Sequence, residues 1–198
     1  MESAEKRTSS TDFRQEAGLI AAAQGGDAKA FGQLVRLHQR PIWRVAYGLT
    51  RNASDADDLT QETFVRAWQA LGRFRVGEPM HPWLARIAVN LAFSLFRTRR
   101  RRPEVPIEPL IEAGQQFAGT DDPAREAVDR DHGRHLAEAF GELSEEHRVV
   151  LVLRVVDQLT YDEIAHTLNV PAGTVMSRLS RARSDLRARL AARTGEAS

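Results

Sequence analysis

The chain has 198 residues, 42% of them hydrophobic, so it is long enough for one or two domains with packed cores. It contains no cysteine, which excludes disulfides, zinc ribbons and thiol catalysis. Its start lacks the apolar core of a signal peptide. Since no run of about 18 apolar residues is present, we expect a cytoplasmic protein without a membrane span.

The net charge of +1 hides an uneven distribution along the chain. Residues 104–146 hold twelve acidic and three basic side chains, a net charge of −9, so the remainder carries +10. Five arginines lie within residues 97–102, and six more lie within residues 178–193. The chain therefore has two basic poles separated by an acidic middle.

The first half of the chain predicts a helical domain over residues 13–102, preceded by a disordered tail over residues 1–12. A first helix ends at the glycine pair 25–26, and Asp27 is a good N-cap for the next helix. Within that helix Pro41 lacks the amide that an uninterrupted helix uses, so we expect a kink or a new helix there.

Residues 54–71 predict an amphipathic helix with Ser54 as its N-cap. The expected buried face consists of Ala56, Leu59, Thr63, Phe64, Ala67, Trp68 and Leu71. The other face is acidic and polar with one valine, which suits a partner surface, and consists of Asp58, Gln61, Glu62, Val65 and Gln69. A metal site at Asp55, Asp57 and Asp58 is the weaker interpretation, because carboxylates favour a helix start and no histidine stands nearby.

The loop 72–80, GRFRVGEPM, leads into a basic helix over residues 81–102. In this loop Phe74, Arg75 and Val76 look exposed. Aromatic and cationic side chains beside a basic helix are the composition that holds single-stranded nucleic acid. Taken alone the pattern is weak, because aromatic residues such as Phe74 are more often core than stacking platforms.

Residues 103–121 combine prolines, glycines and acids, and we interpret them as a linker. A smaller helical domain is expected over residues 122–191, starting with a helix at Asp122, and a C-terminal tail over residues 192–198. The predicted fold class is therefore all-α, with two helical domains joined by a flexible linker.

Residues 159–190 predict two helices separated by a tight turn. Thr160 and Glu163 have the spacing of a capping box at the start of the first helix. Pro171 suits the first turn of the second helix, where its missing amide is not needed. The second helix carries a narrow apolar stripe of Val175, Leu179, Ala182, Leu186 and Leu190. This pattern predicts a helix-turn-helix.

The polar face of the second helix has the chemistry of a DNA-reading helix. At about 100° per residue, the face opposite the stripe and its flanks hold Thr174, Met176, Ser177, Arg178, Ser180, Arg181, Arg183, Ser184 and Arg187. Short side chains let a helix enter a major groove, and arginine can pair with guanine or bind phosphate. A solvated, arginine-rich surface helix is the simpler interpretation, but the cap, the short turn and the arginines together favour DNA binding.

No sequence motif indicates catalysis, because P-loop, HExxH and GxSxG patterns are all absent. His132 and His135 have a spacing that can chelate a metal, but no third ligand is evident. We therefore expect no enzymatic activity, no metal and no cofactor.

Three segments together resemble the extracytoplasmic-function (ECF) sigma factors, the small sigma-70-family subunits of bacterial RNA polymerase. SDADDLTQETFVRAWQAL is similar to the region 2 helix that binds core polymerase, and PWLARIAVNLAFSLFRTRRRR to the helix that reads the −10 element. LTYDEIAHTLNVPAGTVMSRLSRARSDLRARL is similar to the region 4 helix-turn-helix. The resemblance covers roughly residues 14–98 and 123–190 in the family's order.

This resemblance implies three sets of contacts and one further partner. The clamp of the largest polymerase subunit would contact Asp58, Gln61, Glu62, Val65 and Gln69. The melted −10 strand would contact Phe74, Arg75, Val76, Arg86, Asn90 and Arg97. The −35 element would be read by Thr174, Met176, Ser177, Arg178, Ser180, Arg181 and Arg183. An anti-sigma factor commonly masks these surfaces in the family and is an expected partner.

Three positions depart from the family's usual pattern. Ser144 stands where proline is frequent, Met176 where lysine or arginine is frequent, and Ser180 where bulkier side chains occur. The methionine at position 176 implies that one phosphate or base contact of the family is missing, and the small Ser180 leaves the preferred −35 sequence open. Two other functions remain as alternatives: a stand-alone helix-turn-helix regulator that binds a palindromic operator without polymerase, and a metal-dependent helical enzyme.

Overall fold

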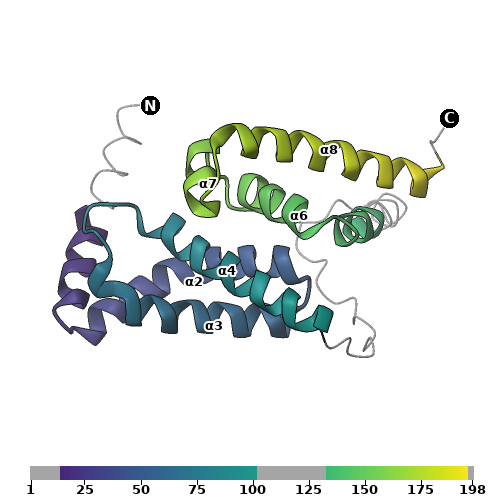
Figure 1. Cartoon of the computed structure of the whole chain (residues 1–198). Helices are drawn as coiled ribbons and strands as arrows, with labels where there is room; N and C mark the ends of the chain where they lie inside the picture. The colour runs from purple at the N-terminus through teal and green to yellow at the C-terminus, as the bar shows by residue number, and fades with distance from the viewer. Residues whose placement is uncertain (1–13, 102–132, 196–198) are drawn as a thin grey trace, which may run out of the picture.

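Figure 1 shows a computed structural model in which residues 14–101 and 133–195 are described. Within these two ranges every regular element is a helix, and the all-α prediction is confirmed. The expected N-terminal tail, the linker 103–121, the helix start at Asp122 and His132 lie outside the described residues. No helix within the described ranges combines the length and the apolar character needed to cross a bilayer.

The first domain consists of a helix over residues 14–24 followed by α2 (Ala28–Thr50), α3 (Ala53–Ala70) and α4 (Met80–Arg101). As predicted, the Asp27 carboxylate caps α2 by accepting hydrogen bonds from two backbone amides. Helices α2, α3 and α4 all pack against one another (Figure 1), so their apolar stripes share one core.

Two expected helix starts are wrong. No new helix begins at Pro41, because α2 runs through this residue as one helix, and the buried residues Ile42 and Val45 keep it packed on the core beyond the proline. The alternative that the sequence left open, a kink at Pro41, stays a prediction. Helix α3 is capped by Asn52 rather than Ser54, because Arg51 takes a left-handed conformation with φ 57° and ends α2 there. Asn52 is then the first extended residue, and its side chain accepts from the Asp55 amide at 3.0 Å.

The second domain consists of a helix over residues 133–141, α6 (Glu145–Leu151), the π-helical turn η2 (Val152–Val156), α7 (Tyr161–Leu168) and α8 (Ala172–Thr194). Two predictions about its helix starts are confirmed. Ser144 caps α6, and the capping box of α7 is complete. In that box the Thr160 hydroxyl accepts from the Glu163 amide at 3.3 Å, and the Glu163 carboxylate accepts from the Thr160 amide at 2.7 Å.

The helix-turn-helix is also present, with α7 packed against α8. Asn169, in a left-handed conformation, ends α7, and Pro171 takes the N-cap position of α8, one residue earlier than expected.

The two domains pack directly against each other. Helix α2 contacts α6 and η2, while α4 contacts α7 (Figure 1). Where α2 meets η2, a Cβ added to Gly48 would lie 3.0 Å from Cγ2 of Val152, so the missing side chain of glycine allows the contact. The buried apolar residues form one cluster that runs through both domains.

Candidate nucleic-acid and polymerase interfaces

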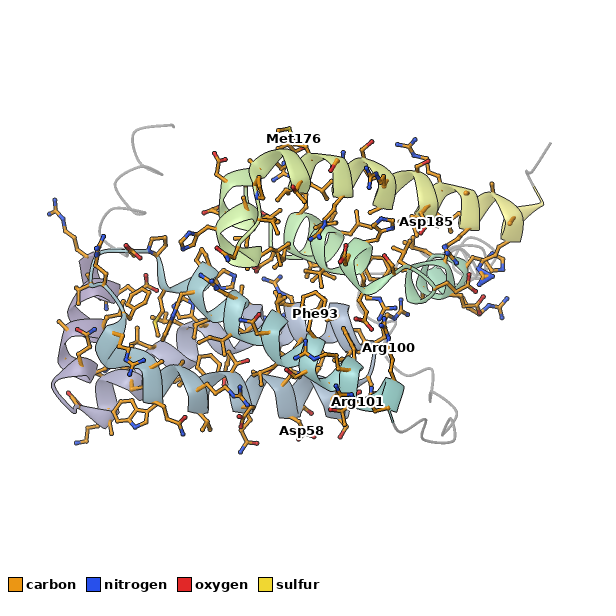
Figure 2. All side chains as sticks on the ribbon, in the orientation of Figure 1. Asp58, Phe93, Arg100, Arg101, Met176 and Asp185 are labelled. Atoms are coloured by element: carbon orange, nitrogen blue, oxygen red, sulfur yellow. The ribbon has the colours of Figure 1, made fainter. Side chains whose placement is uncertain are left out.

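Helix α8 turns its predicted reading face toward solvent. Val175, Leu179 and Ala182 of the apolar stripe are at most 1% exposed and anchor the helix. On the other side Met176, Ser177, Ser180, Arg181 and Arg183 are exposed, while Thr174 and Arg178 are half-buried. Figure 2 shows Met176 on the outer edge of α8 and Asp185 on the side that faces α6.

The six arginines of α8 fall into two groups. Three are paired with carboxylates: Arg178 with Glu146 at 3.2 Å, Arg189 with Asp185 at 2.8 Å and Glu142 at 2.9 Å, and Arg193 with Glu142. Hydrogen bonds from Arg189 and Arg193 lower the pKa of Glu142 below its ordinary value. The other three, Arg181, Arg183 and Arg187, are exposed and have no ion-pair partner within the described part of the chain. These three are free to meet phosphate or guanine, whereas Arg178 is less available than its sequence position indicates.

The predicted −10 surface lies on α4 and on the loop before it. Asn90 and Arg97 are exposed on α4. Arg86, nearer the start of the same helix, is half-buried. In the loop Arg75 and Val76 are exposed, as expected. The structure thus leaves five of the six predicted residues at least partly accessible.

Phe74 is the exception, and the expectation that it is exposed is wrong. Its side chain is 8% exposed and packs on Trp83 with ring centroids 4.8 Å apart. The loop is drawn inward because the Gln24 amide donates hydrogen bonds to the carbonyls of Leu71 and Phe74 at 2.8 and 2.7 Å. Phe74 therefore supports the loop from beneath and offers no stacking surface.

The basic end of α4 faces acidic side chains of both domains. Arg99 pairs with Asp55 at 2.7 Å, and Arg100 pairs with Glu145 at the start of α6 at 2.8 Å. A cleft of about 430 Å³ lies at this junction, lined by Phe93, Arg97, Arg100, Ser144, Glu145 and Glu146. Figure 2 shows Phe93 and Arg100 on the side of α4 that faces the second domain.

Two of the three carboxylates considered as a metal site have other partners. Asp55 pairs with Arg99, and Asp57 accepts a hydrogen bond from Nε1 of Trp43 at 2.7 Å. Within residues 14–101 and 133–195 no three histidine, aspartate or glutamate side chains are placed to hold a metal ion.

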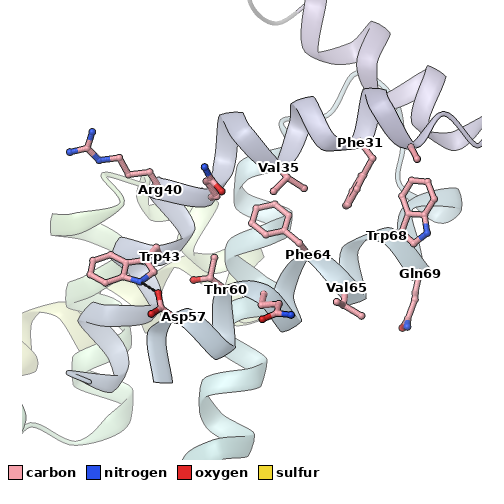
Figure 3. A pocket seen from close by; sticks show the side chains of 13 residues that line it. Phe31, Val35, Arg40, Trp43, Asp57, Thr60, Phe64, Val65, Trp68 and Gln69 are labelled. Carbon is pink, nitrogen blue, oxygen red and sulfur yellow. Dashed lines mark hydrogen bonds between the residues drawn. The ribbon is translucent and has the colours of Figure 1, made fainter. Parts of the chain in front are cut away.

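A large apolar groove of about 840 Å³ runs between α2 and α3 (Figure 3). Phe31 and Val35 of α2 and Phe64 of α3 line its length, and Trp43 and Trp68 lie toward its two ends. Trp68 was expected to be buried but is 41% exposed, because its ring stacks obliquely on Phe31 at 4.8 Å and forms a wall of the groove.

Three of the five predicted polymerase contacts, Gln61, Val65 and Gln69, line this groove. The other two lie beside it: Asp58 is exposed, and Glu62 pairs with Arg66 at 2.7 Å. Sequence reasoning missed the contribution of α2, because its apolar residues look like ordinary core until α3 is placed beside them.

Sequence comparisons match both halves of the chain to known families. Residues 34–102 match the model of sigma-70 region 2, and residues 134–186 match that of sigma-70 region 4. The chain is 33% identical to the RNA polymerase sigma-H factor of Pseudomonas aeruginosa over 174 residues, which cover 85% of this chain and 90% of the relative. It is 34% identical to the ECF RNA polymerase sigma-E factor of Escherichia coli over 172 residues, which cover 83% and 88% of the two chains.

Two solved structures are similar over most of their length. CnrH in complex with the cytosolic domain of CnrY has a TM-score of 0.66 and 31% identity, covering 90% of this chain and 98% of CnrH. The sigma factor RpoE in complex with the anti-sigma factor NepR from Bartonella quintana has a TM-score of 0.66 and 26% identity, covering 82% and 98%.

A region 2 domain followed by a region 4 helix-turn-helix defines a sigma-70-type transcription initiation factor. The chain belongs to the ECF RNA polymerase sigma factors of this family.

Proposed function

We propose that this sigma factor binds core RNA polymerase in the cytoplasm, recognises the −35 and −10 promoter elements and helps to melt the −10 region. It acts as the specificity subunit and performs no catalysis itself. The observation that supports DNA reading most directly is the outer face of α8, where Arg181, Arg183 and Arg187 stand exposed beside short side chains. Arginine in that setting can pair with guanine edges or with phosphate.

The groove between α2 and α3 is the proposed docking site for the polymerase clamp. An amphipathic partner helix would cover the aromatic residues Phe31, Phe64 and Trp68. The polar residues Gln61 and Gln69 line the same groove and can supply hydrogen bonds. Asp58, Glu62 and Val65 complete the proposed contact surface on α3.

The −10 strand is proposed to lie along α4 and its preceding loop. Arg75 and Val76 would receive a flipped base, Asn90 would contact the strand, and Arg86 and Arg97 would lie near phosphate. Phe74 contributes by holding the loop in place, because its ring is packed on Trp83.

An anti-sigma factor is the proposed regulatory partner. Both similar structures, CnrH with CnrY and RpoE with NepR, are complexes of two proteins, and the second is described as a sigma factor with its anti-sigma factor.

The domain limits 13–102 and 122–191 stay a prediction.

Two measurements test the proposed function. The purified chain should copurify with core polymerase, and the mixture should start transcripts from a subset of genomic promoter fragments in a run-off assay. The free chain should bind the same duplexes only weakly. Strong binding to a palindromic duplex without polymerase would instead support the stand-alone regulator, and failure both to bind core and to initiate would contradict the proposal.

A further inference from the structure

Met176 is an exposed apolar side chain in the middle of a polar surface. It is 51% exposed, whereas its neighbour Val175 is 0% exposed in the apolar stripe. Val175, Leu179 and Ala182 pack α8 against the core, whereas Met176 is not part of that core. A single exposed apolar side chain is common on protein surfaces. Met176 is distinguished by its position, because it lies near the start of α8 on the polar face that is proposed to read DNA.

The side chains around Met176 are small. Gly173 lies three residues before it and Ser180 four residues after it, so both are its neighbours on the helix surface. A Cβ added at Gly173 would meet no atom within 4 Å. The Met176 side chain therefore projects beyond these two neighbours, and a base pair could approach it without meeting a bulky side chain at either position.

The polar groups next to Met176 are partly engaged within the protein. The Ser177 hydroxyl donates to the Thr174 carbonyl at 3.0 Å, and Arg178 pairs with Glu146 at 3.2 Å. Of the exposed groups near the start of α8, Met176, Ser180 and Arg181 are the ones without such a partner among the described residues. Residues in this part of a reading helix contact base edges.

We infer that Met176 sets a base preference in the −35 element by contacting the C5-methyl group of a thymine in the major groove. This inference rests on the proposed role of α8. Thymine is the base that offers an apolar group in the major groove, and the flexible, polarisable thioether of methionine packs well on such a group. Met176 cannot donate a hydrogen bond, so the contact discriminates by the methyl group alone.

The first test is selection from a promoter pool with a randomised −35 element. Run-off transcription uses core polymerase with the native chain, Met176→Ala or Leu136→Ala. Leu136 is a matched control, because it is also apolar and 47% exposed but lies outside α8. The native chain and Leu136→Ala should enrich thymine at one position, and Met176→Ala should lower that enrichment about fourfold, the size expected for burying one methyl group.

The second test removes the methyl group from the DNA. Deoxyuridine replaces the selected thymidine in a synthetic promoter, which deletes the methyl group and keeps the pairing. Initiation by the native chain should fall about fourfold, and Met176→Ala should transcribe both templates equally.

Either of two results would overturn the inference: equal use of both templates by the native chain, or a thymine preference that survives in Met176→Ala. Absence of initiation with every protein would overturn the proposed function first, and this inference with it.

Discussion

Nε2 of His81 lies 2.5 Å from Oδ1 of Asp157 and joins the start of α4 to the turn that follows η2. Two more polar contacts tie the domains together, since Arg148 donates to the Leu49 carbonyl at 3.1 Å and Arg51 to the Ala137 carbonyl at 2.5 Å.

A compact chain of this length is about 40 Å across. By their names the −10 and −35 elements lie about 25 base pairs apart, which is about 85 Å at the rise of about 3.4 Å per base pair of B-form DNA. Under the proposed function the domains therefore separate when both elements are bound.

A disulfide between positions 48 and 152 should lock the domains together. A Cβ at Gly48 would lie 3.7 Å from Cβ of Val152, close to the mean of about 3.8 Å in disulfides. The natural chain has no cysteine, so the pair Gly48→Cys and Val152→Cys can form only this intramolecular bridge. The oxidised double variant should lose promoter-dependent initiation, and reduction with dithiothreitol should restore it.

Each single cysteine variant serves as the control for this experiment and should initiate with and without reductant. If no bridge forms under oxidising conditions, the two domains do not pack as described. If the bridged protein initiates normally, separation of the domains is not needed.

Replacing Arg148 by alanine should destabilise the packed form. Its guanidinium donates to the carbonyls of Leu49, Gly141 and Leu143 and lies over the Phe96 ring, 5.9 Å from its centroid. Burial of the guanidinium lowers the pKa of Arg148 below its ordinary value. We expect the free energy of unfolding to fall by about 2–4 kcal/mol, because several carbonyls lose a charged donor. Denaturant unfolding measures this change.

The matched control is Arg44→Ala, since Arg44 is exposed on α2. Its effect should stay within about 0.5 kcal/mol. Equal stability of the two variants would show that the Arg148 contacts contribute little.

Changing Glu62 to lysine should weaken binding to core polymerase about tenfold and leave the fold intact, because a charge is reversed at the edge of the proposed interface. Glu62 makes one exposed ion pair with Arg66, so its loss costs little stability. Affinity is measured by fluorescence titration of labelled protein with core enzyme. Glu138→Lys, a reversal of the same size at an exposed residue of the second domain, should bind normally. Unchanged affinity of Glu62→Lys would remove this residue from the interface.

Replacing Arg181 by alanine should reduce discrimination at one −35 base pair by about 1–3 kcal/mol if the guanidinium contacts a base edge. Arg189→Ala is the comparison. Arg189 is paired with Asp185 and Glu142, so its replacement should leave the base preference unchanged. Competition between promoter variants in run-off transcription measures both. Unaltered transcription and selectivity in Arg181→Ala would show that the proposed reading role is wrong.

Features set by neighbours along the chain were predictable from the sequence. The capping box of Thr160 and Glu163 spans four residues, and the stripe from Val175 to Ala182 spans two helical turns. Both depend on helix geometry alone. Together with the family resemblance they were sufficient for the all-α fold, the helix-turn-helix and the sigma factor assignment.

The cap residue of α3 could not be predicted from the local sequence alone. Asn52 and Ser54 are both good cap residues, so propensity could not choose between them. The chain reversal at Arg51 decided the choice, and that reversal places α3 against α2.

The sequence by itself determined the helices and most of their buried apolar faces, because these follow from residues a few positions apart. Only the tertiary structure decided that Phe74 is buried, that Trp68 forms the wall of a groove, and that Glu146 engages Arg178. It also decided that Gly48 meets Val152. Each of these outcomes depends on contacts between helices, and the spacing of residues within one helix does not specify which neighbour that helix will meet.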